Sequence, residues 1–251
     1  MRALFRSEEV AAQVREPIHA NVPELNGAEL ASIYYGYRMA GDFYDFIRVS
    51  PNRVLFGLLD VAGGLQDTRA IVSAAQQTFR TLGTDLFSAK DVNEADAMME
   101  LCLQLNRTIL KTADGVRSCP AFAGCYDENL GIVCYFNAGH TPGLARDRNG
   151  VTELPATGLP LGLFSHMTAD ASLVAIEPGG VLLLASRGII EAKQKHKSEE
   201  FGLERVKEVL QSSEAISPKE LCVSVLDQMQ NFIGTAPTHD DVTALALARN
   251  A

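Results

Sequence analysis

Residues 42–60 read DFYDFIRVSPNRVLFGLLD, a stretch in which two mostly apolar runs flank the dipeptide Pro51-Asn52. This dipeptide is typical of a tight turn, so we expect strands over 43–49 and 53–60 on either side of it. Two strands joined by a short turn pair in antiparallel fashion. The second strand is mostly apolar and ends at Asp60, which is followed by a glycine-containing turn. The stretch therefore favours an antiparallel sheet with an acidic residue at one strand end.

More strands are predicted in both directions from this stretch. They are expected over 29–35, 121–126, 131–137, 143–146, 151–154, 172–177, 180–185 and 241–248. Helices are expected over 8–20, 66–83, 94–111, 202–211 and 217–233. Beyond the short first helix, the helices come as two consecutive pairs, whereas a doubly wound parallel sheet needs strand and helix to alternate. We therefore predict an α+β layered domain of antiparallel sheets with helices packed outside them.

Local signals fix several element ends. Asn93 is expected to cap the helix over 94–111, and Ser217 with Glu220 forms a capping box at the start of the last helix. Asp127 to Leu130 separates two strands as a hairpin turn.

Composition narrows the class of protein. The chain of 251 residues suits one large domain, and with 47% hydrophobic residues it can bury a sizeable core. Its formal net charge of −9 argues against a nucleic-acid partner, because polyanions attract basic surfaces. No apolar stretch approaches the length of a membrane span, so we expect no membrane partner.

Five cysteines, with no Cys-x-x-Cys pair among them, give no disulfide framework. Reduced, buried thiols fit a reducing compartment, so we expect a cytoplasmic protein. Residues 1–27 are interpreted as a lead-in or linker segment, and residues 28–249 as the folded domain. The apolar helix of the lead-in is a candidate for homodimerisation.

Three aspartates stand at strand ends: Asp42, Asp60 and Asp240. Aspartate is a poor strand residue, and each one alone is explained by a turn cap, a role we assign to Asp45. As a set they give oxygen ligands on rigid strand ends beside glycines. Carboxylates without His or Cys select Mg²⁺ or Mn²⁺ rather than zinc, and such ions handle phosphate.

Seven short blocks then identify a family. They are GDFYDF at 41–46, DVAG at 60–63, NAGHTP at 137–142, GLPLGLF at 158–164, EPGG at 177–180, FG at 201–202 and DDVT at 240–243. In this order, and over roughly residues 25–248, the chain resembles bacterial PPM-type (protein phosphatase type 2C-like) phosphatases of the SpoIIE-like group. The resemblance implies a four-layer αββα sandwich. It also implies Mn²⁺- or Mg²⁺-dependent hydrolysis of phosphoserine or phosphothreonine on a protein, with a metal-activated water attacking phosphorus.

The resemblance also assigns roles to residues. Asp60 would bridge two metals, the Val61 carbonyl would bind one, Asp240 would be a terminal ligand, and Asp42 would be a ligand directly or through water. Asp42 and Asp60 are thus the catalytic candidates. Asp241 is expected behind the ligands, and His140 is interpreted as structural rather than as a general acid.

The chain departs from the family at Arg187. The family carries Ser-Asp-Gly after a hydrophobic strand, whereas strand 180–185 here runs into Ser186-Arg187-Gly188. At about 5 Å and an effective dielectric of about 20, each pair of unit charges interacts by roughly 3 kcal/mol, so a cation in place of a ligand should weaken the second metal site. Three positions are open to Arg187. It would pair with the aspartates, point to solvent while water or Asp241 replaces it as a metal ligand, or bind the substrate phosphate.

Two functions follow. One is a metal-dependent phosphoprotein phosphatase of bacterial signalling, whose substrate by family resemblance would be an anti-sigma-factor antagonist. The other is a pseudophosphatase that binds a phosphoprotein or partner without turnover. Arg187 favours the second function, and the retained Asp42, Asp60 and Asp240 favour the first.

Overall fold

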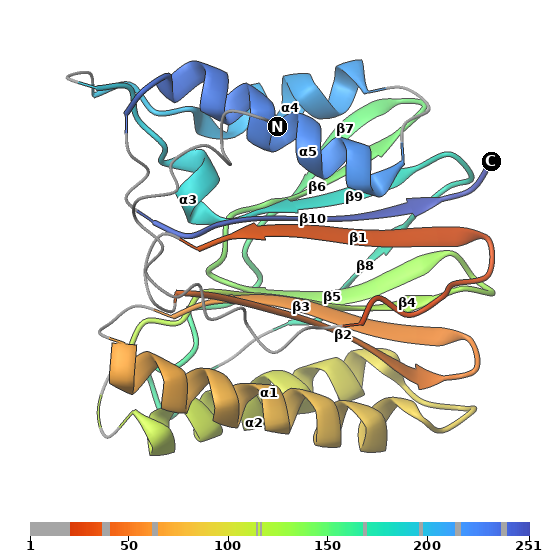
Figure 1. Cartoon of the computed structure of the whole chain (residues 1–251). Helices are drawn as coiled ribbons and strands as arrows, with labels where there is room; N and C mark the ends of the chain where they lie inside the picture. The colour runs from red at the N-terminus through yellow and green to blue at the C-terminus, as the bar shows by residue number, and fades with distance from the viewer. Residues whose placement is uncertain are drawn as a thin grey trace.

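The computed structural model describes residues 21–36, 41–61, 65–113, 115, 117–167, 170–195, 198–213, 217–236 and 240–251. Two five-stranded antiparallel sheets are stacked on each other, and helices cover both outer faces (Figure 1). The expected α+β class and four-layer αββα sandwich are therefore confirmed. The expected helix over 8–20 lies outside the described residues.

The first sheet has the strand order β1-β10-β9-β6-β7. Its strands are β1 (Ala28–Tyr35), β10 (Val242–Arg249), β9 (Val181–Ala185), β6 (Gly143–Asp147) and β7 (Gly150–Leu154). The second sheet has the order β2-β3-β4-β5-β8. Its strands are β2 (Asp42–Ser50), β3 (Arg53–Asp60), β4 (Ala121–Asp127), β5 (Ile132–Ala138) and β8 (Ser172–Ala175). Each predicted strand is present within one or two residues of its expected ends.

Helices α1 (Leu65–Phe87) and α2 (Glu94–Thr112) cover the second sheet, and α4 (Gly202–Ser212) and α5 (Pro218–Ile233) cover the first (Figure 1). The side chain of Asn93 accepts from the backbone N–H of Asp96, and both bonds of the Ser217–Glu220 capping box are present. These caps confirm the predicted helix starts. A one-turn helix, α3 (Arg187–Ile190), was not predicted. No helix among the described residues is both long and apolar enough to span a bilayer.

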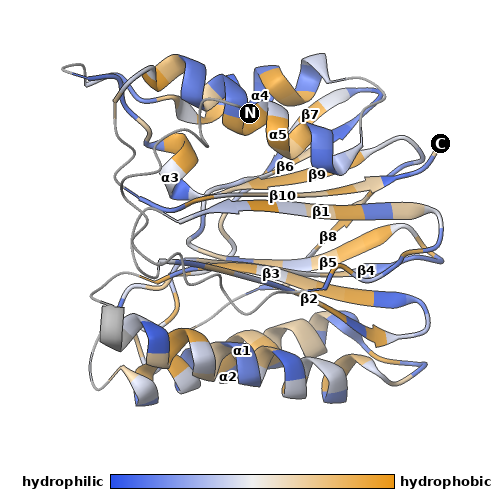
Figure 2. Ribbon diagram, viewed as in Figure 1, coloured by the Kyte–Doolittle hydropathy of each residue, from blue (hydrophilic) through white to orange (hydrophobic). Residues whose placement is uncertain are grey.

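Three apolar clusters fill the spaces between the four layers. One lies between α1–α2 and the second sheet, one lies between the sheets, and one lies between the first sheet and α4–α5. In Figure 2 orange segments recur along the strands of both sheets, and orange alternates with blue along the helices. Strand β3 shows the consequence: all its residues are buried, with Leu55 in the helix-side cluster and Phe56 in the cluster between the sheets. A strand covered on both faces reads as a continuous apolar run.

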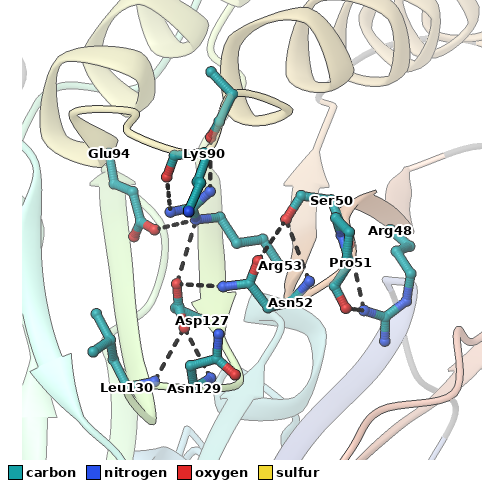
Figure 3. A network of polar contacts seen from close by, with 11 residues as sticks. Arg48, Ser50, Pro51, Asn52, Arg53, Lys90, Glu94, Asp127, Asn129 and Leu130 are labelled. Carbon is teal, nitrogen blue, oxygen red and sulfur yellow. Dashed lines mark hydrogen bonds and ion pairs between the residues drawn. The ribbon is translucent and has the colours of Figure 1, made fainter.

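A polar network holds the end of the sandwich where β3 begins (Figure 3). The Arg53 guanidinium contacts Glu94 at 2.6 Å and Asp127 at 3.4 Å, and it donates to the Ala89 carbonyl at 2.9 Å. The network therefore joins β3, the start of α2 and the end of β4. It lies at the opposite end of β3 from Asp60.

All five cysteines are buried and free, as the sequence predicted. They lie in the apolar clusters between the sheets and the helices.

Candidate functional site

The acidic strand ends meet where the two sheets face each other. Asp42 begins β2 and Asp60 ends β3, and the antiparallel register places them directly opposite each other. Their residues are only 6% and 4% exposed. Asp240 and Asp241 immediately precede β10 of the other sheet. The hairpin and the stacking of the sheets thus bring four aspartates from three chain segments to one end of the molecule.

Asp42 is held by hydrogen bonds from the first sheet. Its backbone N–H donates to Oδ2 of Asp241 at 3.1 Å, and the hydroxyl of Thr243 donates to Oδ2 of Asp42 at 2.6 Å. The Tyr34 hydroxyl on β1 also donates to Asp241 Oδ2, at 3.2 Å. Asp241 therefore lies behind Asp42 and orients its backbone. A Cβ on Gly41 would come within 2.7 Å of the Asp241 carboxylate, so this approach requires glycine.

Arg187 lies between Asp60 and Asp240. Its Nε is 3.2 Å from Oδ2 of Asp60, and its NH2 donates to Oδ2 of Asp240 at 3.3 Å. The Nε is buried but makes no aligned hydrogen bond, although the side chain as a whole is 42% exposed. Of the three expectations for Arg187, this geometry matches pairing with the aspartates. The contacts are long for charge-assisted hydrogen bonds, which are usually 2.7–2.9 Å.

The turn that carries Arg187 is packed against the acidic segment. Ser186 is fully buried, donates to the Asp241 carbonyl at 3.3 Å, and accepts from the Thr243 N–H at 2.9 Å. A Cβ on Gly188 would lie 2.0 Å from the Asp241 carbonyl oxygen. The backbone of this turn is thus fixed on Asp241, and the position of Arg187 follows from it.

Burial dominates the electrostatics of the site. It raises the pKa of Asp42 well above its ordinary value, with the Asp60 charge adding to the effect and the Thr243 hydrogen bond opposing it. Burial also raises the pKa of Asp60, against the opposing charge of Arg187. For Arg187, burial pulls the pKa down, but the carboxylates of Asp60 and Asp240 outweigh it and leave the pKa raised. The carboxylates are thus under-compensated, because one guanidinium faces several acids.

His140 lies on the connection that crosses from β5 to β6, between the sheets. Its backbone N–H donates to Asn137 Oδ1 at 2.8 Å, and its Nδ1 is 3.0 Å from the Thr141 carbonyl oxygen. The Thr141 hydroxyl donates to the carbonyl of Ala185, the last residue of β9. Burial lowers the pKa of His140 to about 4, so the imidazole is neutral near pH 7. These contacts tie the β5–β6 connection to the strand that leads into Arg187.

The predicted metal-binding residues fit one part of the expected metal site but not the other. Among the residues that the structure describes, no three Asp, Glu, His or Cys side chains are grouped so as to hold an ion. All four predicted donors, Asp42, Asp60, Asp240 and the Val61 carbonyl, come from segments at this end of the molecule. The space between Asp60 and Asp240 is taken by the Arg187 guanidinium. The residues present therefore do not fit a second ion at that place. Arg187 also pairs with Asp60, whereas Asp42 makes no ion pair with a basic side chain among the residues that the structure describes.

Sequence reasoning missed some of the contacts. The Tyr34 and Thr243 hydroxyls were not among the expected site residues, because their partners lie about 200 positions away in the chain. The turn-cap role assigned to Asp45 is wrong. Asp45 lies inside β2, is fully buried, and accepts a bidentate ion pair from Arg80 on α1 at 2.6 and 2.9 Å.

Comparison with known proteins gives matches over most of the chain. A family model described as Stage II sporulation protein E (SpoIIE) matches residues 50–250. Protein IcfG from Synechocystis is 23% identical over 92% of this chain and 39% of its own length. Phosphoserine phosphatase RsbP from Bacillus subtilis is 26% identical over 67% of this chain and 41% of its own length. The chain thus spans about two fifths of the length of these curated relatives.

A solved structure shares the fold. The SiaA-PP2C domain of Pseudomonas aeruginosa superposes with a TM-score of 0.70 at 19% identity, over 87% of this chain and 85% of that chain. At that identity the likeness establishes the architecture alone, and it agrees with the four layers described above.

Proposed function

Because this chain belongs to the SpoIIE family of PPM-type (PP2C-type) phosphatases, we propose that it dephosphorylates phosphoserine or phosphothreonine on a bacterial signalling protein. One observation carries the proposal: Asp42 and Asp60 are buried directly opposite each other on paired strand ends, beside a second acidic segment from the other sheet. Buried acids gathered without bases to match them are costly for stability, so a catalytic or binding role explains their presence.

The proposed cofactor is Mn²⁺ or Mg²⁺. When bound, such an ion supplies Lewis-acid stabilisation of phosphoryl oxygens and a water of lowered pKa. In this chain Asp60 and the Val61 carbonyl would hold one ion, with Asp42 contributing directly or through water and Asp240 as a terminal ligand. Asp241 and Thr243 fix the orientation of Asp42, and Asp241 is not itself a ligand in this scheme. Arg187 impairs the second position, because its charge lies between Asp60 and Asp240.

The proposed substrate is a phosphorylated anti-sigma-factor antagonist, and the proposed compartment is the cytoplasm. Support for the substrate class comes from the family and from the relative named phosphoserine phosphatase RsbP. The domain would comprise residues 28–249, with residues 1–27 as a lead-in that connects it to a regulator or mediates a homodimer.

A second function, a pseudophosphatase, is favoured by one specific observation. Arg187 already pairs with Asp60 and Asp240, so the acids are partly neutralised without a metal ion. A domain of this kind would bind a phosphoprotein or partner and hold it without turnover.

The deciding experiment compares three proteins: wild type, Arg187→Asp and Asp60→Asn. Mn²⁺ binding is measured by calorimetry, and hydrolysis of a phosphoserine peptide is measured with and without Mn²⁺. We expect one Mn²⁺ in the wild type, a second in Arg187→Asp together with faster turnover, and no Mn²⁺-dependent hydrolysis in Asp60→Asn. If neither wild type nor Arg187→Asp binds Mn²⁺ or hydrolyses the peptide, the phosphatase proposal is wrong. Metal binding by the wild type without any turnover would favour the pseudophosphatase.

A further inference from the structure

The side chain of Arg187 can move, although its backbone is fixed. The turn on either side of it is held on the acidic segment by hydrogen bonds and close backbone packing. Its guanidinium contacts Asp60 and Asp240 at 3.2 and 3.3 Å, and the side chain is 42% exposed. A divalent cation beside Asp60 would repel this guanidinium, because both carry positive charge. The side chain must then rotate away from Asp60 while its Cα stays in place.

Helix α3, which lies next to the start of β10 (Figure 1), places an acidic residue within reach of this rotation. Glu191 directly follows α3, and its backbone N–H donates to the Arg187 carbonyl at 2.8 Å. This bond closes one helical turn, so the two residues stand four apart on the same face, with Cβ atoms about 5–6 Å from each other. Ile189 lies about 200° around the helix from both and is fully buried. The face that carries Arg187 and Glu191 is therefore turned away from the apolar cluster that holds Ile189.

The Glu191 carboxylate is exposed, and its charge acts on the acidic site. Burial lowers the pKa of Arg187, and after the two paired aspartates Glu191 is the next carboxylate that raises it. Burial raises the pKa of Asp60, and Glu191 adds a smaller rise. Among the residues that the structure describes, Glu191 has no basic side chain within ion-pair distance. Its carboxylate is therefore available to Arg187 as an alternative partner.

Resting on the proposed function, we propose that Glu191 is a positioning residue that receives the Arg187 guanidinium when a divalent cation is bound beside Asp60. In the protein without the ion, Arg187 pairs with Asp60 and Asp240. With the ion in place, the guanidinium turns along α3 and pairs with Glu191 at the surface. The positive charge of Arg187 stays paired in both states, so the acidic site fills more readily than if the guanidinium moved into solvent without a partner.

A double-mutant cycle in Mn²⁺ affinity tests this change of partner. Calorimetry at about 0.15 M salt measures the affinity for the first Mn²⁺ of wild type, Glu191→Gln, Arg187→Gln and the double variant. An exposed carboxylate also attracts the ion directly, but this screened attraction is the same with and without the arginine. We expect Glu191→Gln to weaken binding about fourfold in the wild-type background and by less than about twofold in the Arg187→Gln background. The ratio of the two factors measures the Arg187–Glu191 contact.

Glu29→Gln is the matched control and should leave the Mn²⁺ affinity unchanged. Glu29 is exposed and lies on β1, six residues before Tyr35, which pairs with Val242 at the start of β10. At about 3.3 Å per residue it is about 20 Å from the acidic end of the sheet, where its charge is screened. NMR gives a second readout. With Mg²⁺ added, the Arg187 Nε–H resonance should lie at different positions in wild type and Glu191→Gln, and identical positions would contradict the change of partner.

Other outcomes overturn the proposal in distinguishable ways. If Glu191→Gln weakens Mn²⁺ binding by the same factor in both backgrounds, Glu191 acts on the ion by its charge alone, and the proposed function stands without the change of partner. If the loss is larger in the Arg187→Gln background, Glu191 is itself a metal ligand. If Glu191→Gln changes neither affinity, Arg187 moves into solvent without a partner. If wild type binds no Mn²⁺, the metal-dependent function fails together with the change of partner.

Discussion

Replacing Arg80 with Met removes the guanidinium that pairs with Asp45, its one basic partner among the residues that the structure describes. The Asp45 carboxylate is fully buried, and Arg80 contacts it through Nε at 2.6 Å and through NH2 at 2.9 Å. Its other donors are the Gln76 amide at 3.2 Å and the Phe46 N–H at 2.9 Å. After the substitution a carboxylate would remain in an apolar setting with two neutral donors.

The expected cost follows from this geometry. Breaking a buried ion pair by removing one partner costs about 3–5 kcal/mol. The Arg80 side chain is 40% exposed, so part of its charge is already screened by water, and we expect about 2–3 kcal/mol. The double variant Asp45→Leu, Arg80→Met should recover most of this loss, because no charge is then left buried.

Urea unfolding followed by circular dichroism at pH 7 measures the free energy of unfolding of each variant. Arg148→Met is the control, because Arg148 pairs with Glu177 at 3.4 Å with its side chain 81% exposed, and should cost less than about 0.5 kcal/mol. If Arg80→Met costs no more than Arg148→Met, the Asp45 carboxylate does not depend on Arg80. If the double variant is less stable than Arg80→Met, the loss comes from packing and not from an uncompensated charge.

Three further predictions concern the site and the core. Gly188→Ala should destabilise the domain by about 1–3 kcal/mol in thermal unfolding, because its Cβ would lie 2.0 Å from the Asp241 carbonyl oxygen; an unchanged midpoint would contradict this. Burial lowers the pKa of His140 from 6.5 to about 4, so as the pH falls this histidine is protonated in the unfolded chain before it is protonated in the folded one. Stability should therefore fall by about 3 kcal/mol between pH 6.5 and 4, and His140→Asn should remove that part of the loss. The five buried thiols should react with a disulfide reagent at pH 8 only after unfolding, and rapid labelling would show that the core opens.

The layers of this fold were predictable because each strand and helix carries a local signal. Turn residues, caps and apolar alternation placed most ends within one or two residues. Helix α1 is the exception, since it was expected to end at Gly83 but continues to Phe87. A Cβ at Gly83 would lie 2.5 Å from the Leu55 side chain, so this glycine permits close helix–sheet packing rather than ending the helix. Only the packed structure supplies that reason.

The site was predictable in part for the same reason. A hairpin centred near Pro51 brings Asp42 opposite Asp60, so local sequence determines this pair. The partners of Asp45 and Asp241 depend on contacts between distant segments, and no local pattern encodes them. Arg80 is 35 positions from Asp45, and Tyr34 is 207 positions from Asp241. The short helix α3 falls below the length at which periodicity can indicate a helix.

The strength with which Arg187 holds its aspartates separates the two functions considered for this chain. Its contacts are 3.2 and 3.3 Å long, its Nε is not aligned for a hydrogen bond, and its side chain is 42% exposed. These long, unaligned contacts make the pair weaker than an ideal charge-assisted one, but the Asp60 side chain is only 6% exposed, so removing the guanidinium without replacing its charge would leave a buried carboxylate uncompensated. A divalent cation has twice the charge of the guanidinium and is drawn by carboxylates whose pKa values burial has raised. If Arg187 moves toward solvent as the ion binds, the charge of the ion replaces that of the guanidinium, so the arginine and one metal ion beside Asp42 and Asp60 are compatible. The comparison favours a metal-binding phosphatase with a weakened second metal position over a pseudophosphatase whose acidic residues are neutralised by Arg187.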